Sequence, residues 1–108
     1  MKATYWQNGE AIDYVNNTTD IIQANTVVVL GQKLGVIGAT ISPGEKGVLH
    51  TVGVFKMSKN SEEVVAAGTT VYFTGEVITA TATGNTLAGY TVQEAKAGVT
   101  DILVKLQG

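Results

Sequence analysis

Few residues in this sequence are of the types that catalyse reactions or bind metals. Cysteine is absent, and histidine occurs once, as His50, within an apolar segment. A metal site needs several such ligands and a thiol nucleophile needs a cysteine, so the sequence predicts neither. We expect His50 to pack at the edge of a core or at a subunit contact.

The carboxylates are no better arranged for acid-base catalysis. Glu62 and Glu63 are adjacent, so on a strand or a turn they point in different directions and cannot hold one substrate between them. We expect both to be solvated. Glu10 and Asp13 lie close in sequence, but no base or nucleophile neighbours them. Asp13 is expected to accept hydrogen bonds from backbone N–H groups in a turn.

The glycine-rich segment from Gly31 to Gly38 has only a superficial similarity to a phosphate-binding loop. Such a loop must follow a strand and open a helix, or contain Gly-Lys followed by Ser or Thr. Neither condition holds here. Because other catalytic motifs are also missing, we predict that the protein is not an enzyme and has no catalytic, cofactor-binding or metal-binding residues.

Charge and composition argue against two further classes of partner. The formal net charge is −2, arginine is absent, and the lysines are scattered singly, so we expect no nucleic-acid partner. The longest apolar run, Val27–Leu30, is far shorter than the ~20 residues that span a bilayer, so we expect no membrane segment. The polar opening Met1–Trp6 lacks a secretory signal, which together with the missing cysteines favours a soluble protein of a reducing cytoplasm.

Any function must therefore rest on the scaffold, which is rich in strand and turn residues. Val and Thr are the commonest residues and favour strands, while 13 glycines mark turns. Turn signals about every ten residues are typical of a sandwich or barrel. We predict an all-β, small single-domain β-barrel or folded-over sandwich of short antiparallel strands, with at most one or two short helical turns. The expected strands are 11–15, 27–30, 34–39, 47–57, 69–74, 76–81, 86–92 and 100–106.

Two segments of this scaffold have special features. In the longest expected strand, Gly47–Met57, the valines and His50 alternate on one face, while Phe55 falls on the other. That change of phase near Gly53 indicates a bulge or a strand that changes the face it presents. Residues 60–68 form the one window that is compatible with a short helix.

An internal echo links the two halves of the chain. Ala24–Leu30 aligns with Ala67–Phe73, and each segment leads into a tight turn and an apolar return strand. Hairpins made of Val, Thr and Gly look alike, so we take shared composition as the simpler explanation. A true duplication is the alternative.

The N-terminus lacks the strand pattern of the remainder. We predict that residues 1–10 form a flexible arm and that residues 11–108 form a single β domain. Tyr5 and Trp6 lie on this arm, and an exposed aromatic pair is more often a docking anchor than an accident. The alternative is that Trp6 folds back onto its own sheet. The expected contact residues of the arm are Lys2, Ala3, Thr4, Tyr5, Trp6 and Gln7.

Several segments, taken together and in order, resemble a known family. They are MKATY (1–5), GEAIDY (9–14), VVL (28–30), LGV (34–36), GVF (53–55), AGTTVYF (67–73) and TGNTLAGY (83–90). In this combination the chain is similar to a widespread family of phage and prophage proteins described as capsid cement or decoration proteins. Each motif alone is common in turns and strands, so the resemblance rests on their order along nearly the whole chain.

The resemblance implies a structural protein of the virion, made in the cytoplasm of the bacterial host. It would bind the exterior of an expanded phage capsid and reinforce contacts between major capsid subunits. Its partners would be the major capsid protein and itself, as a homotrimer. The alternatives are a stand-alone β-barrel that binds a ligand such as a glycan, and another virion component such as a fibre base. Against a glycan site, Tyr72 and Phe73 are strand neighbours and face opposite ways.

Overall fold

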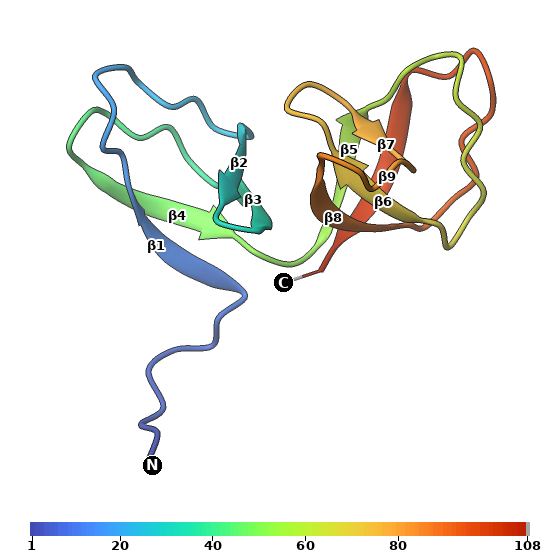
Figure 1. Cartoon of the computed structure of the whole chain (residues 1–108). Helices are drawn as coiled ribbons and strands as arrows, with labels where there is room; N and C mark the ends of the chain where they lie inside the picture. Colours follow the sequence, from blue (N-terminus) through green and yellow to red (C-terminus); the bar gives the residue numbers. More distant parts are fainter. Residues whose placement is uncertain (108) are drawn as a thin grey trace.

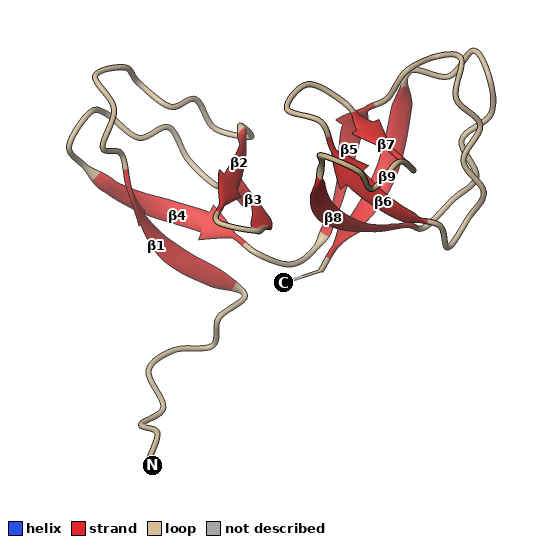
Figure 2. Cartoon of the chain, viewed as in Figure 1, coloured by secondary structure: helices blue, strands red, loops and turns tan. Residues whose placement is uncertain are grey.

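The computed structural model describes residues 1–107, which form short strands joined by turns and contain no helix (Figure 2). The all-β prediction is therefore confirmed. No helix that could cross a membrane occurs among these residues. The strands are β1 (Ala11–Val15), β2 (Val27–Leu30), β3 (Lys33–Ile37), β4 (Lys46–His50), β5 (Val54–Ser58), β6 (Thr70–Phe73), β7 (Ile78–Thr79), β8 (Thr86–Thr91) and β9 (Asp101–Leu106).

The strands form two antiparallel sheets, one from each half of the chain (Figure 1). The first sheet has four strands in the order β1-β4-β3-β2. The second has five, in the order β5-β9-β8-β6-β7. Neither is a closed barrel, and of the two predicted architectures the structure has the sandwich-like one. The extra strand β7 is the main topological difference between the halves.

The two sheets repeat one topology, because β1, β2, β3 and β4 correspond to β5, β6, β8 and β9 in both chain order and sheet order. Isolated bridges also correspond: Ile22 pairs with Ile41 in the first half, and Val65 pairs with Ala95 in the second. The sequence echo lies on β2 and β6 with the turns that precede them. The shared composition of two hairpins does not account for so many matching elements, so the structure favours the duplication.

The turn before β2 and the turn before β6 match in detail. Asn25 has a φ of 70° and Gly68 has a φ of 79°, the left-handed conformation that few residues other than glycine and asparagine adopt. The Asn25 N–H donates to the Ile37 carbonyl at 2.8 Å, and the Gly68 N–H donates to the Thr91 carbonyl at 2.8 Å. Each of these hydrogen bonds ties the turn to the last residue of the neighbouring strand, which is β3 in the first half and β8 in the second.

Strand β3 joins the two hydrophobic clusters of the molecule. Neighbouring side chains on a strand face opposite ways, so Leu34 and Val36 enter the larger cluster while Ile37 enters the smaller one. The larger cluster otherwise belongs to the second half, and its buried members are Met57, Val65, Val71, Ile78, Ala88, Ala95, Ile102, Val104 and Leu106. The smaller cluster has only three fully buried residues, Ile37, Ile41 and Leu49.

The single long strand predicted over Gly47–Met57 is wrong. Residues 51–53 connect β4 to β5, which lie in different sheets (Figure 1). The irregularity predicted near Gly53, where φ is 125°, is a connection between sheets and not a bulge or a change of face, because Leu49 and Met57 are both buried in one continuous alternation. The valine face of this segment points outward, with Val48 and Val54 exposed, whereas Leu49 is buried on the other face. The alternation of apolar residues correctly predicted strands in this segment, but it did not predict which of the two faces is buried.

The window at residues 60–68 contains turns and no helix. Val65 in its centre exchanges two backbone hydrogen bonds with Ala95, at 2.8 and 2.9 Å. A helix would direct these groups along its own axis, so the long-range bridge prevents it. Other predicted strand ends differ by a few residues: β3 stops at Ile37, and the second hairpin shortens to β6 and β7.

A buried polar side chain follows the first strand of each half. Asn16 is fully buried, and its amide group donates to the carbonyls of Asp20 at 2.8 Å and Ile41 at 2.9 Å. Lys59 holds the corresponding place after β5, and its ammonium group donates to the carbonyls of Asn60 and Glu63. In each half the side chain thus holds a long loop against the sheet by hydrogen bonds to its backbone.

We expect Asn16→Ala to lower the free energy of unfolding by about 1–3 kcal/mol, because it removes a fully buried side chain that donates to the Asp20 and Ile41 carbonyls and accepts from the Thr18 N–H. Urea denaturation followed by circular dichroism measures the change. Asn17 is adjacent but exposed, so Asn17→Ala is the matched control and should shift the value by less than about 0.5 kcal/mol. Equal losses for the two variants would contradict the role given to Asn16.

Candidate protein-interaction site

The structure places His50 at the edge of the core, as predicted. It ends β4, is half-buried, and its ring centroid lies 6.5 Å from that of Phe55. Within residues 1–107 no three His, Cys, Asp or Glu side chains are grouped so that they could hold a metal ion. His50 therefore packs against an aromatic ring at the point where the chain crosses between sheets.

Glu62 and Glu63 behave differently. Glu62 is exposed, as expected, but the Glu63 carboxylate accepts hydrogen bonds from the Thr79 hydroxyl at 3.2 Å and the Ala80 N–H at 2.9 Å. The prediction that both are solvated is therefore wrong for Glu63. This carboxylate fixes the end of β7 to the loop that precedes β6, a role that depends on a contact 17 residues away in sequence.

Asp13 lies within β1, so its expected turn position is also wrong. Its carboxylate is 3.8 Å from the Lys46 ammonium group, and both side chains are about two-thirds exposed. Exposed pairs of this kind contribute little to stability. The glycine-rich segment from Gly31 forms the β2–β3 hairpin and opens no helix, which agrees with the argument against a phosphate loop.

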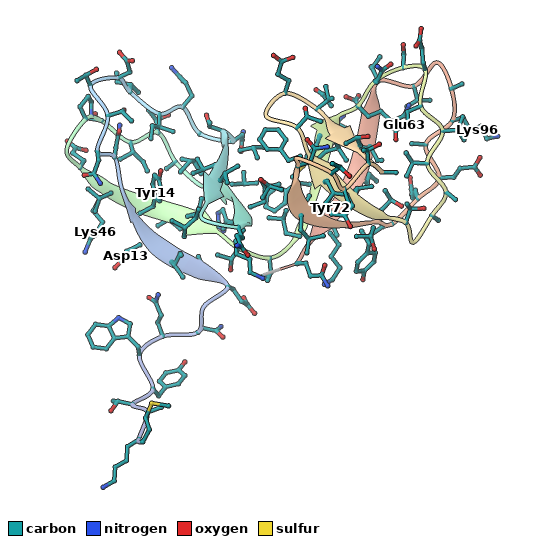
Figure 3. All side chains as sticks on the ribbon, in the orientation of Figure 1. Asp13, Tyr14, Lys46, Glu63, Tyr72 and Lys96 are labelled. Atoms are coloured by element: carbon teal, nitrogen blue, oxygen red, sulfur yellow. The ribbon has the colours of Figure 1, made fainter. Side chains whose placement is uncertain are left out.

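The N-terminal residues extend away from the two sheets (Figures 1 and 3). Residues 1–8 have no regular structure, and Tyr5 and Trp6 are 82% and 86% exposed. Trp6 does not fold back onto its own sheet. The first contact of this terminus with the β domain is at Gly9, whose carbonyl accepts a hydrogen bond from the Thr51 hydroxyl at 2.6 Å. The candidate contact residues from Lys2 to Gln7 thus form one extended, accessible segment.

The chain exposes more surface than is usual for its size. Its accessible area is 6919 Å², whereas a compact monomer of this mass has about 5,700 Å². The radius of gyration is 15.0 Å, against about 13 Å for a typical domain of this length. The separate sheets and the extended arm account for both differences, and they leave much surface for contacts with partners.

The second half joins its two edge strands, whereas the first half does not. A parallel bridge between Lys59 and Ile78 brings the end of β5 against β7. Strands β1 and β2 are the edges of the first sheet, and no strand lies between them. On β2, the side chains of Val29 and Leu30 are 44% and 47% exposed. Apolar residues on an unpaired edge form a site where another chain can add a strand.

A hollow of about 430 Å³ lies beside this edge. Tyr14, Val15 and Leu30 give it an apolar wall, and Asp13, Asn17 and Thr18 give it a polar rim. Sequence reasoning missed this site, because it treated Val27–Leu30 only as an apolar strand and not as a free edge. Comparison of the halves reveals it, since two strands, β7 and β8, lie between β6 and β9, whereas only β3 lies between β2 and β4.

Aromatic side chains do not gather in one hollow of the β domain. Phe73 lines a hollow with Met57 and Ile78, while Tyr72 lines another with Gln32 and Leu87. The two neighbours on β6 face opposite ways, as expected from the strand period. Tyr72 and Phe73 therefore do not form the row of aromatic residues that a glycan site would use.

Comparison with known proteins gives one match. The family model described as phage cement protein matches residues 6–106, which is nearly the whole chain. Searches of curated proteins and of solved structures give no match. The family is one of structural proteins of the phage capsid, which points to a non-enzymatic protein. Because the match covers both sheets, this chain belongs to the phage cement protein family.

Proposed function

We propose that the protein binds the exterior of an expanded phage capsid and reinforces the contacts between major capsid subunits. The family match over residues 6–106 carries this proposal. The molecule suits such a role because it offers free sheet edges and an exposed arm. Many modest contacts repeated over a lattice stabilise a shell without any one of them being strong.

In this proposal residues 1–10 form a mobile arm and residues 11–108 form one β domain. The arm contacts the capsid through Lys2, Ala3, Thr4, Tyr5, Trp6 and Gln7. Free in solution, it cannot bury enough surface to offset about 1–2 kcal/mol of backbone entropy per ordered residue. On the capsid, the edge of a neighbouring sheet supplies the missing hydrogen bonds by strand addition.

The functional form in this proposal is a homotrimer on the virion, assembled from chains made in the host cytoplasm. Exposed apolar residues on the sheets support self-association: Val29, Leu30, Val48 and Val54 are each more than 40% exposed. The protein acts without catalysis and without a cofactor, metal, nucleic acid or membrane.

Deleting residues 1–8 tests the arm. We expect the melting temperature of the free protein to be nearly unchanged, because Tyr5 and Trp6 are exposed and the contacts of the terminus begin at Gly9. Binding to capsids should be lost. Differential scanning calorimetry measures the first effect, and co-sedimentation with expanded and unexpanded shells measures the second.

The two kinds of shell serve as each other's control, since the full chain should sediment with expanded shells only. A full chain that stays in the supernatant with both would contradict the proposed function. A truncated chain that is unfolded would show that the arm is a built-in part of the sheet, and its docking role would be withdrawn.

Replacing one arm residue tests the anchor. We expect Trp6→Ala to weaken binding to expanded shells by about 2 kcal/mol or more, because a large aromatic side chain loses a buried contact. Val64 is also exposed but lies in the second half, so Val64→Ala is the control and should bind like the unaltered chain. Titration of labelled protein onto shells measures both affinities, and equal affinities would exclude Trp6 as an anchor.

Sedimentation equilibrium tests the oligomer. At concentrations on the order of tens of micromolar, which suit interfaces of modest size, we expect a trimer. A Val48→Lys variant should shift the equilibrium toward monomer if the exposed valines form the interface. If the unaltered protein remains monomeric at every concentration, it does not form the trimer without the capsid.

A further inference from the structure

Comparison of the two halves shows that the first half lacks a strand corresponding to β7. In the second half, β7 pairs with β6, so that Tyr72 lies opposite Thr79 and Phe73 lies opposite Ile78. The corresponding residues of β2 are Val29 and Leu30, because the echo aligns Ala24–Leu30 with Ala67–Phe73. Neither has a strand opposite it on this side.

The backbone of β2 has the same free groups that β7 satisfies on β6. The Ile37 N–H donates to the Thr26 carbonyl at 2.9 Å. In an antiparallel pair the hydrogen-bonded residues alternate, so Val28 also faces β3 and the backbone groups of Val29 point to the open side. Tyr72 holds this position on β6 and is opposite Thr79. A strand beside β2 would therefore find a donor and an acceptor at Val29.

The hollow beside Leu30 is the vacant counterpart of the place that Ile78 fills. In the second half Ile78 is buried in the larger cluster with Met57, lies opposite Phe73, and is bridged to Lys59, which follows Ser58. By strand register, the first-half counterparts of these β5 and β6 residues are Tyr14, Val15 and Leu30, and these three line the hollow of about 430 Å³. An apolar side chain from an added strand would enter this hollow.

An acidic residue stands where the end of the added strand would lie. Glu63 accepts hydrogen bonds from Thr79 and Ala80 at the end of β7. The alignment that pairs Ile22 with Val65 places Asp20 at the position of Glu63. Asp20 is exposed, so its carboxylate is accessible to a donor from an added strand.

The direction of the added strand decides which chain supplies it. β7 is antiparallel to β6 and bridges Lys59 in the parallel sense, so its counterpart must run parallel to β1. The molecule's own arm enters β1 at its N-terminal end and would have to double back, antiparallel to β1, to reach the hollow. The arm of a second copy has no such constraint.

We propose that residues 4–7 of a second copy add to β2 as a strand, with Tyr5 in the hollow beside Leu30. The wall of Tyr14, Val15 and Leu30 contacts the ring, and the polar rim is within reach of the hydroxyl group, which suits an aromatic side chain with one polar end. Thr4 and Trp6 then face the opposite side of the added strand, where they contact the capsid. This inference rests on the proposed function and names the edge that receives the arm.

Chemical cross-linking on expanded shells tests the inference, since the natural chain has no cysteine. One batch carries Gln7→Cys and the other carries Asp20→Cys with a tag that alters its size. A short bis-maleimide is added after the two batches are mixed and bound to shells. We expect a product of mixed size. In the proposed register Gln7 takes the place of Ala80, whose N–H donates to the Glu63 carboxylate, and Asp20 takes the place of Glu63. Glu62→Cys in place of Asp20→Cys is the matched control and should give about tenfold less product.

A second variant tests whether cross-linking depends on the hollow itself and not only on the proximity of two chains. Leu30→Lys should reduce the mixed product about tenfold while the melting temperature of the free chain changes by less than about 2 °C, because Leu30 is half exposed. Product formation that is insensitive to Leu30→Lys, or equal to that of the control pair, would overturn the proposal. So would a dominant product with the capsid protein.

The same samples distinguish the two proposals. Variants that sediment with the shells but give no mixed product contradict the addition of the arm to a second copy and leave the proposed function intact. Loss of sedimentation by the unaltered chain contradicts the proposed function and, with it, the inference. A chain that carries both substitutions and cross-links within itself at high dilution would show that its own arm occupies the hollow. That result would overturn the proposal.

Discussion

The packing of β3 on both hydrophobic clusters is the contact on which the remaining structure depends. The smaller cluster has three fully buried side chains, too few to stabilise a four-stranded sheet alone. Leu34 and Val36 add the buried surface of the first sheet to the larger cluster, while Ile37 holds the smaller one together. The connection at residues 51–53 can be short and irregular because β3, and not the connection, holds the two sheets in place.

The repeat explains both the similarities and the imbalance of the halves. Each half fixes its long loop with a buried polar side chain, Asn16 or Lys59, and begins its hairpin with a left-handed residue. The second half adds β7, which covers the edge of β6 and brings Ile78 into the core. Without that insertion, the edge of β2 stays open beside an apolar hollow. A monomer that needed both halves closed for stability would not leave this edge exposed, so the asymmetry suits an assembly contact.

The sequence predicted the parts of the fold that depend on local pattern. Val, Thr and Gly gave the strand positions, and the loss of phase at Gly53 marked the crossing between sheets. Pattern alone did not give the inner face of residues 47–57, because valines occupy the outer face as well. Nor did it predict the bonds of Glu63 or the bridge at Val65, which depend on residues far away in the chain. The lack of regular structure at residues 1–8 was evident from composition, whereas the hollow became visible only when the two halves were compared.

An exposed apolar edge is a hazard for a protein that must stay dispersed before assembly, and the molecule limits it in three ways. β2 is four residues long, so a single added strand gains few hydrogen bonds. Lys33 begins β3 opposite Leu30, and Lys46 begins β4 opposite Val15, so charged side chains lie near the edge and its hollow. In the proposed strand addition the arm would lose backbone entropy on docking, so an isolated pair of chains would gain little from the contact. On a lattice the chains are already held side by side, which raises the effective concentration of each arm at the next edge. In the proposed function, a contact too weak to join free chains would thus still link neighbouring chains on a shell.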